Sequence, residues 1–162
     1  MPSDDTPTIR RVPVIAIAAA VCIAIGCDGD RARVRKSPAD TLKTAAAHMK
    51  LTFPENTRVL GYDSSIGERS LLPTPDHYIQ LKVEFDRADL DAFLKGSPFA
   101  NETLDTEQRK VSGTSDATWW NPDAPVRFRS GSVELPSVEF LNILIDLDRK
   151  DKVVVYLMWH ET

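Results

Sequence analysis

Two β-rich runs close the chain and constrain its fold more than any other feature. The first covers Phe140–Leu147 and the second covers Lys152–His160, with the charged residues 148–151 between them. Two such runs joined by a short polar segment predict a β-hairpin. Residues 153–159 are apolar on both faces of the second strand, so both faces need cover. The pattern therefore predicts a central strand with helices over one face.

Two upstream stretches predict helices. Ser37 and Pro38 supply a capping hydroxyl and a proline at the first helical position, and residues 39–51 are rich in helix formers. Asp86 is expected to cap a second, short helix that covers residues 87–95. Each stretch has an apolar stripe at helical spacing, which indicates contact with a core.

Further strands are expected around these helices. Residues 58–62 form a short candidate, and residues 78–85 alternate between an apolar face and a solvated face made by the even-numbered positions. Residues 126–135 are expected to form a strand pair, whereas residues 96–125 are irregular. Because helices and strands do not alternate regularly, we predict an α+β fold. Its mostly antiparallel sheet would have four to six strands, two helices packed on it and the C-terminal hairpin at its centre.

The N-terminal segment has a different composition. Arg10 and Arg11 precede an uninterrupted apolar run from Val12 to Ile25, and Gly26 and Cys27 follow it. The run is about 14 residues long, whereas a membrane-spanning helix needs roughly 20. A charged start, a short apolar middle and a small residue at the end are typical of a cleaved export signal.

The tetrapeptide Ala24-Ile25-Gly26-Cys27 resembles the lipobox of bacterial lipoproteins. The resemblance covers residues 10–28 and departs from the class at Ala24, where a branched aliphatic residue is usual. It implies that the Cys27 thiol receives a diacylglycerol, that a peptidase cuts before it, and that this lipid anchors the protein on the extracytoplasmic face of a membrane. Asp28 resembles an inner-membrane retention signal, with the outer membrane as the alternative. Two other interpretations are a signal peptide cut elsewhere and an uncleaved anchor.

The chain is thereby divided into three parts. Residues 1–26 would be the signal peptide, residues 27–37 the lipidated cysteine with a polar tether, and residues 38–162 a single α+β domain. Cleavage would leave the formal net charge at −4, since the acids and arginines removed cancel. This mild acidity argues against nucleic acid as a partner. Lipidation would use the one remaining cysteine, so neither a disulfide nor a cysteine-based metal site is expected.

No sequence pattern assigns catalysis, a cofactor or a metal. Residues 61–67 lack both the Gly-x-Ser-x-Gly spacing of a nucleophile elbow and the ending of a phosphate loop. His48, His77 and His160 lack metalloprotease spacing and are expected to be structural or solvated. The aspartates around the C-terminal turn lack the glycine and the further oxygen ligands of a calcium loop. We therefore assign no catalytic, cofactor-binding or metal-binding residue.

Trp119 and Trp120 are the best candidates for a binding surface. On an extended segment their indoles point in opposite directions, so one can pack in the core while the other is exposed. An exposed indole near Arg127 and Arg129 would suit sugar stacking or a protein partner. The alternative is that both indoles pack as a lid over the sheet.

These features favour a lipid-anchored, extracytoplasmic binding or interaction protein of the bacterial envelope over an enzyme. Its partner would be an envelope protein, a wall fragment or a secreted toxin, and in the last case the protein would act as an immunity or inhibitor protein. The alternatives are a hydrolase-like envelope enzyme whose acid–base residues are not identified, and a purely structural envelope lipoprotein.

Overall fold

The computed structural model describes residues 37–65, 77–113, 117–136 and 138–161. Cys27 and the rest of the expected signal peptide and tether, apart from Ser37, lie outside these residues. In chain order the elements are α1 (Pro38–Met49), β1 (Arg58–Ser64), β2 (Tyr78–Asp86), the 3₁₀ turn η1 (Arg87–Asp89), α2 (Leu90–Lys95), β3 (Phe128–Leu135), β4 (Glu139–Asp146) and β5 (Lys152–Glu161).

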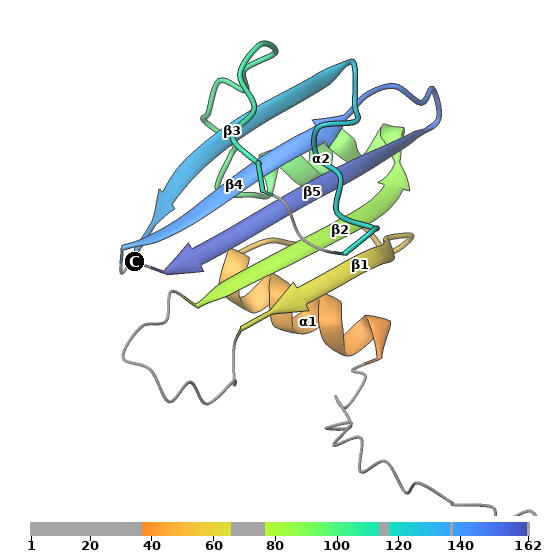
Figure 1. Cartoon of the computed structure of the whole chain (residues 1–162). Helices are drawn as coiled ribbons and strands as arrows, with labels where there is room; N and C mark the ends of the chain where they lie inside the picture. The colour runs from red at the N-terminus through yellow and green to blue at the C-terminus, as the bar shows by residue number, and fades with distance from the viewer. Residues whose placement is uncertain (1–36, 66–76, 114–116, 137, 162) are drawn as a thin grey trace, which may run out of the picture. The chain divides into compact units, whose positions relative to one another are not determined.

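The five strands form one antiparallel sheet in the order β1-β2-β5-β4-β3 (Figure 1). β5 is last in sequence but third in the sheet, where Trp159 stands opposite Ile79 on one side and Leu141 on the other. The predicted α+β class is confirmed, including the antiparallel sheet, the two helices and the central position of the C-terminal hairpin.

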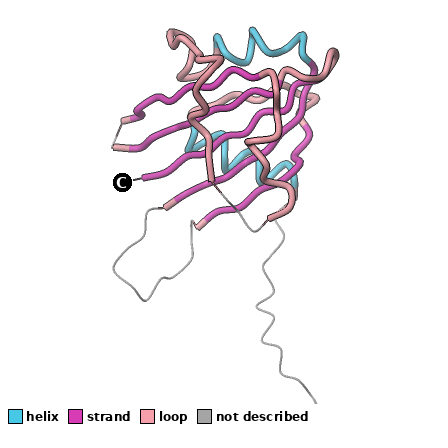
Figure 2. Tube along the Cα trace, turned by 45° about the horizontal axis from the view of Figure 1, so that its top comes forward, coloured by secondary structure: helices cyan, strands magenta, loops and turns pink. Residues whose placement is uncertain are grey.

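The side chains of β5 alternate between two buried faces. Val155 and Leu157 belong to the main core, which also contains residues of α1 and α2. Val154 and Tyr156 belong to a smaller cluster on the opposite face. The chain between α2 and β3 first adds Phe99 and Leu104 to the main core, and its later part, with Val111, Trp119 and Trp120, covers the second face, crossing the strands in front of the sheet in Figures 1 and 2. The central strand is therefore covered by helices on one side and by a loop on the other.

Helix α1 begins where its sequence indicates. The Ser37 hydroxyl accepts a hydrogen bond from the backbone N–H of Asp40 at 3.1 Å, and Pro38 occupies the first helical position. The helix ends at Met49 because Lys50 adopts a left-handed conformation with φ of 54°. The chain thus turns back toward the sheet before it reaches Pro54.

The predicted solvated face of β2 is wrong, because the loop lies over Lys82 and two arginines pair with Glu84. The Lys82 ammonium donates to the backbone carbonyl of Trp119 at 2.9 Å and lies 4.7 Å from the ring centroid of Tyr156. Glu84 is only 9% exposed and forms ion pairs with Arg58 at 2.9 Å and Arg149 at 2.6 Å. Strand alternation correctly separated the two faces but did not indicate that a distant segment covers the second one.

Two local predictions are also wrong. Residues 87–89 form a 3₁₀ turn before α2, and the Asp86 side chain makes no capping hydrogen bond because it pairs with Lys152 at 2.6 Å. The expected strand pair at residues 126–135 is a single strand, β3. It pairs continuously with β4, from Phe128 opposite Asp146 to Leu135 opposite Glu139.

We predict that Leu157→Ala lowers the free energy of unfolding by about 3 kcal/mol, because it leaves a cavity at a fully buried position of the main core. The neighbouring change Met158→Ala is the matched control and should cost much less, since Met158 is only partly buried at the margin of the smaller cluster. Denaturant unfolding of both variants measures the difference. Equal losses would contradict the assignment of the main core to the helix-covered face.

Candidate functional site

The two candidate tryptophans pack on the sheet face opposite the helices. Trp120 is 5% exposed and contacts Tyr156 of β5 edge-on, with ring centroids 5.5 Å apart. Trp119 is half-buried and lies edge-on to Trp120, also at 5.5 Å. We call this part of the smaller cluster the aromatic layer; it comprises Trp119, Trp120, Tyr156 and the aliphatic neighbours Val111, Leu144 and Val154.

Trp119 packs onto β1 at Gly61, next to an irregularity in the strand. The register between β1 and β2 shifts between Val59 and Gly61. A Cβ atom at residue 61 would lie 2.1 Å from carbon atoms of the Trp119 indole, so only glycine leaves room for the ring. This contact and the Lys82 hydrogen bond together hold the loop at the β1 side of the sheet.

Arg109 ties the following part of the loop to the start of β3. Its guanidinium donates to the backbone carbonyls of Pro122 at 2.7 Å and Pro125 at 2.6 Å. The same group lies 4.1 Å from the ring centroid of Phe128, which is a cation–π distance. Neither Arg109 nor Lys82 was singled out from the sequence, because nothing near either residue in the chain indicates its partners.

The two predicted arginines have other neighbours. Arg127 donates to the backbone carbonyls of Leu147 and Asp148 at 3.0 and 2.9 Å and pairs with the Asp148 carboxylate at 3.6 Å. Arg129 is exposed and stands opposite Ile145, so it projects on the helix-covered side of the sheet. The structure therefore brings Trp119 and Trp120 together and places Arg129 on the opposite face.

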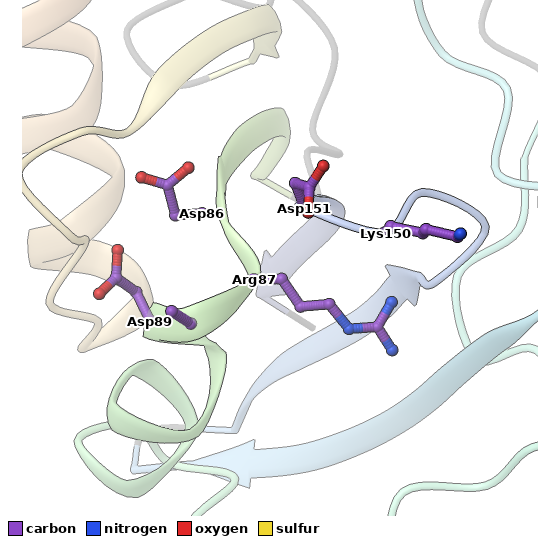
Figure 3. Close-up of a pocket in the computed structure, with 6 residues that line it drawn as sticks. Asp86, Arg87, Asp89, Lys150 and Asp151 are labelled. Carbon is purple, nitrogen blue, oxygen red and sulfur yellow. The ribbon is translucent and has the colours of Figure 1, made fainter.

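A shallow charged hollow lies at the edge of the molecule where β2 meets α2. Residues 86–89 and residues 150–151 line a volume of about 510 Å³. In Figure 3 the carboxylates of Asp86 and Asp89 lie on one side, whereas Arg87 and Lys150 extend to the other. Acids and bases thus both line this hollow.

A second hollow, which we call the Phe53 groove, lies between residues 52–56 and α2. Its volume is about 680 Å³, and its other lining residues are Asp89, Ala92, Phe93 and Gly96. Asn56 connects it to the charged hollow, since its amide donates to Asp86 and, at 3.1 Å, to Asp89. The hydrogen bond and charge of Lys152 keep the pKa of Asp86 below its ordinary value.

Within residues 37–65, 77–113, 117–136 and 138–161, no group of three or more His, Cys, Asp or Glu side chains is placed to hold a metal ion. No helix in the described part of the chain has the length and hydropathy needed to cross a membrane.

Comparisons with protein-family models, with curated proteins and with solved structures found no match for this chain. Its function is therefore inferred from its own residues.

We predict that Gly61→Ala lowers the free energy of unfolding by about 2 kcal/mol, because the added methyl displaces the Trp119 ring. Tryptophan fluorescence should shift to longer wavelength at the same time, since the indole becomes more exposed to water. Gly96→Ala is the control, because its added Cβ meets its nearest neighbour at 3.5 Å. An unchanged emission spectrum in Gly61→Ala would contradict the observed packing.

Asp148 should make stability depend on acid pH. Its carboxylate accepts backbone N–H bonds from Val126 at 2.8 Å and Arg127 at 2.9 Å, and these bonds lower its pKa. A carboxylate whose pKa is lowered by folding stabilises the protein above its unfolded value, about 3.9 for Asp, and loses this effect as pH falls through the folded value.

We therefore predict that Asp148→Asn is less stable than the wild type at neutral pH and loses less stability between neutral pH and the acid range. Denaturant unfolding at several pH values measures both effects. Asp123→Asn, at an exposed position of the segment that precedes β3, serves as the control. Parallel pH profiles for the wild type and Asp148→Asn would contradict the role of this carboxylate.

Proposed function

We propose that the protein is a lipid-anchored binding protein of the bacterial envelope, held at an extracytoplasmic membrane face by a diacylglycerol on Cys27. The observation that carries this proposal is the order of residues 10–28, in which two arginines, a short apolar run and Gly26-Cys27 follow one another. An apolar run of about 14 residues suits a cleaved signal better than a spanning helix of roughly 20. Asp28 favours retention at the inner membrane.

Few residues of the sequence separate the described domain from the proposed anchor. Ser37 caps α1, and only residues 28–36 separate it from Cys27. As a flexible coil, a tether of this length would span about 17 Å r.m.s.. The domain would then work next to the bilayer, and the four basic residues of the tether would be attracted to anionic headgroups.

The binding role is supported by the aromatic side chains that the domain places near its surface. Trp119 is half-buried in the aromatic layer, and Phe53 is partly buried in a groove of about 680 Å³. Aromatic side chains contribute strongly to protein and sugar recognition, because they offer large rigid contact areas. We propose an envelope protein, a wall fragment or a secreted toxin as the partner, with an immunity or inhibitor role in the last case.

The anchoring proposal is tested by mass spectrometry and membrane fractionation of the protein expressed in a bacterium. The wild type should begin at Cys27, carry acyl mass there and sediment with membranes. Cys27→Ser should lose the acyl mass and leave the membrane fraction, because its hydroxyl is not a substrate for lipidation. Cys22→Ser changes the other cysteine of the chain and should behave as the wild type. A native protein that begins elsewhere or carries no acyl group would overturn the proposal.

A further inference from the structure

The Phe53 groove has an aromatic floor that other core residues hold in place. Phe93 is 3% exposed, and its ring stacks on that of Phe53 with a centroid distance of 6.0 Å and an interplanar angle of 23°. Phe85, a fully buried residue of β2, packs against Phe93 from the core side, with ring centroids 5.2 Å apart. Phe53 is only partly buried against this core, so the floor is fixed from below and accessible from the groove.

The charges around this floor have one sign. Among the described residues that line the groove, Glu55 and Asp89 carry charges and neither Lys nor Arg is present. Glu55 is exposed, and the Asp89 carboxylate accepts a hydrogen bond from the neutral amide of Asn56 at 3.1 Å. Lys152 pairs with the neighbouring Asp86, so its charge compensates that acid. The groove thus combines an apolar aromatic floor with acidic residues among its lining.

This combination matches the side chain of a basic residue. The face of an aromatic ring attracts a cation, and carboxylates form short, charge-assisted hydrogen bonds with guanidinium or ammonium groups. Arginine and lysine also carry apolar stems that pack along hydrophobic surfaces while the charged end stays near water. An acidic ligand would be repelled by the lining of the groove. The charged hollow beside it does not select for a cation in this way, because Arg87 and Lys150 also line it.

We propose that the Phe53 groove binds an arginine or lysine side chain of a protein partner, between the Phe53 ring and the carboxylates of Glu55 and Asp89. This inference rests on the proposed binding function and names the chemistry of the partner. Arginine is favoured over lysine, because its planar guanidinium stacks on aromatic rings and bonds carboxylates with two donors.

The probe is the peptide acetyl-Ala-Ala-Arg-Ala-Ala-amide, titrated into the full chain in nonionic detergent and followed by amide NMR shifts. Residues 52–56 and 89–96 should shift in a saturable way. The matched citrulline peptide keeps the shape of arginine without its charge and should bind about tenfold more weakly. Equal binding of the arginine and citrulline peptides, or no shift in these residues, would overturn the proposal.

Variants of this chain test whether Glu55 and Asp89 bind the arginine side chain of the peptide. Glu55→Gln combined with Asp89→Asn should weaken binding of the arginine peptide by about tenfold. Glu55→Gln alone should also weaken peptide binding measurably. Because Glu55 is exposed, this variant provides the test if the double variant does not fold. Asp91→Asn is the control, since Asp91 is an exposed acid of α2 outside the lining. Unchanged affinity in Glu55→Gln would contradict the assignment.

The same experiment separates two other outcomes. If the groove shifts appear on raising the protein concentration without peptide, a second copy of the chain occupies the groove and the proposal is overturned. Acylation at Cys27 is measured independently by mass spectrometry. Acylated protein that does not bind the peptide would overturn the groove assignment alone, whereas unacylated protein would overturn the envelope proposal.

Discussion

The structure depends on β5 being apolar on both faces. Val155 and Leu157 are fully buried on the side that α1 and α2 cover, whereas Val154 and Tyr156 are 4% and 3% exposed on the other side. Burying only one side would leave a stripe of apolar surface in water across the middle of the sheet. Two covering layers are therefore required, and the chain supplies helices for one and a long loop for the other.

Covering a sheet with a loop places many backbone polar groups near a buried surface, and these groups need hydrogen-bond partners. Side chains supply several of them: Lys82 bonds the carbonyl of Trp119, and Arg109 bonds those of Pro122 and Pro125. Ser130 is fully buried, donates to the carbonyl of Ile143 at 2.7 Å and accepts from the backbone N–H of Lys110 at 2.8 Å. Its backbone also pairs with that of Asp105. These polar residues of the strands and the loop therefore hold the loop on the sheet by satisfying its backbone groups.

Charged side chains join neighbouring segments at the end of the sheet near α2. Glu84 joins Arg58 at the start of β1 to Arg149 in the β4–β5 turn, and Asp86 joins Lys152 to Asn56. Arg87 adds a hydrogen bond to the carbonyl of Arg149 at 2.9 Å. The Phe53 groove lies beside this network. Its Phe53 ring stacks on Phe93, which belongs to the main core. Its floor is thus built by interactions independent of the aromatic layer on the opposite face.

Periodicity, capping residues and the order of the expected elements were enough to predict the α+β class, the antiparallel sheet, α1 with its Ser37 cap and the central place of β5. These features follow from residue types, spacings of a few positions and the order of elements, all of which are explicit in the sequence. Trp119 and Trp120 were singled out by residue type in the irregular segment, and their role as a binding surface stays a prediction. The lipobox at Cys27 is likewise a local pattern, and it stays a prediction.

Tertiary structure alone decided what covers the second face and which side chains meet there. Glu84 and Lys82 alternate as solvated residues would, yet one is buried in ion pairs and the other lies beneath the loop. Phe53 and Phe93 are 40 positions apart and form the groove floor only because both α2 and the segment after α1 pack on one core. Such contacts join residues that are distant in the chain. Their energies depend on complementary shape and charge, which local periodicity does not record.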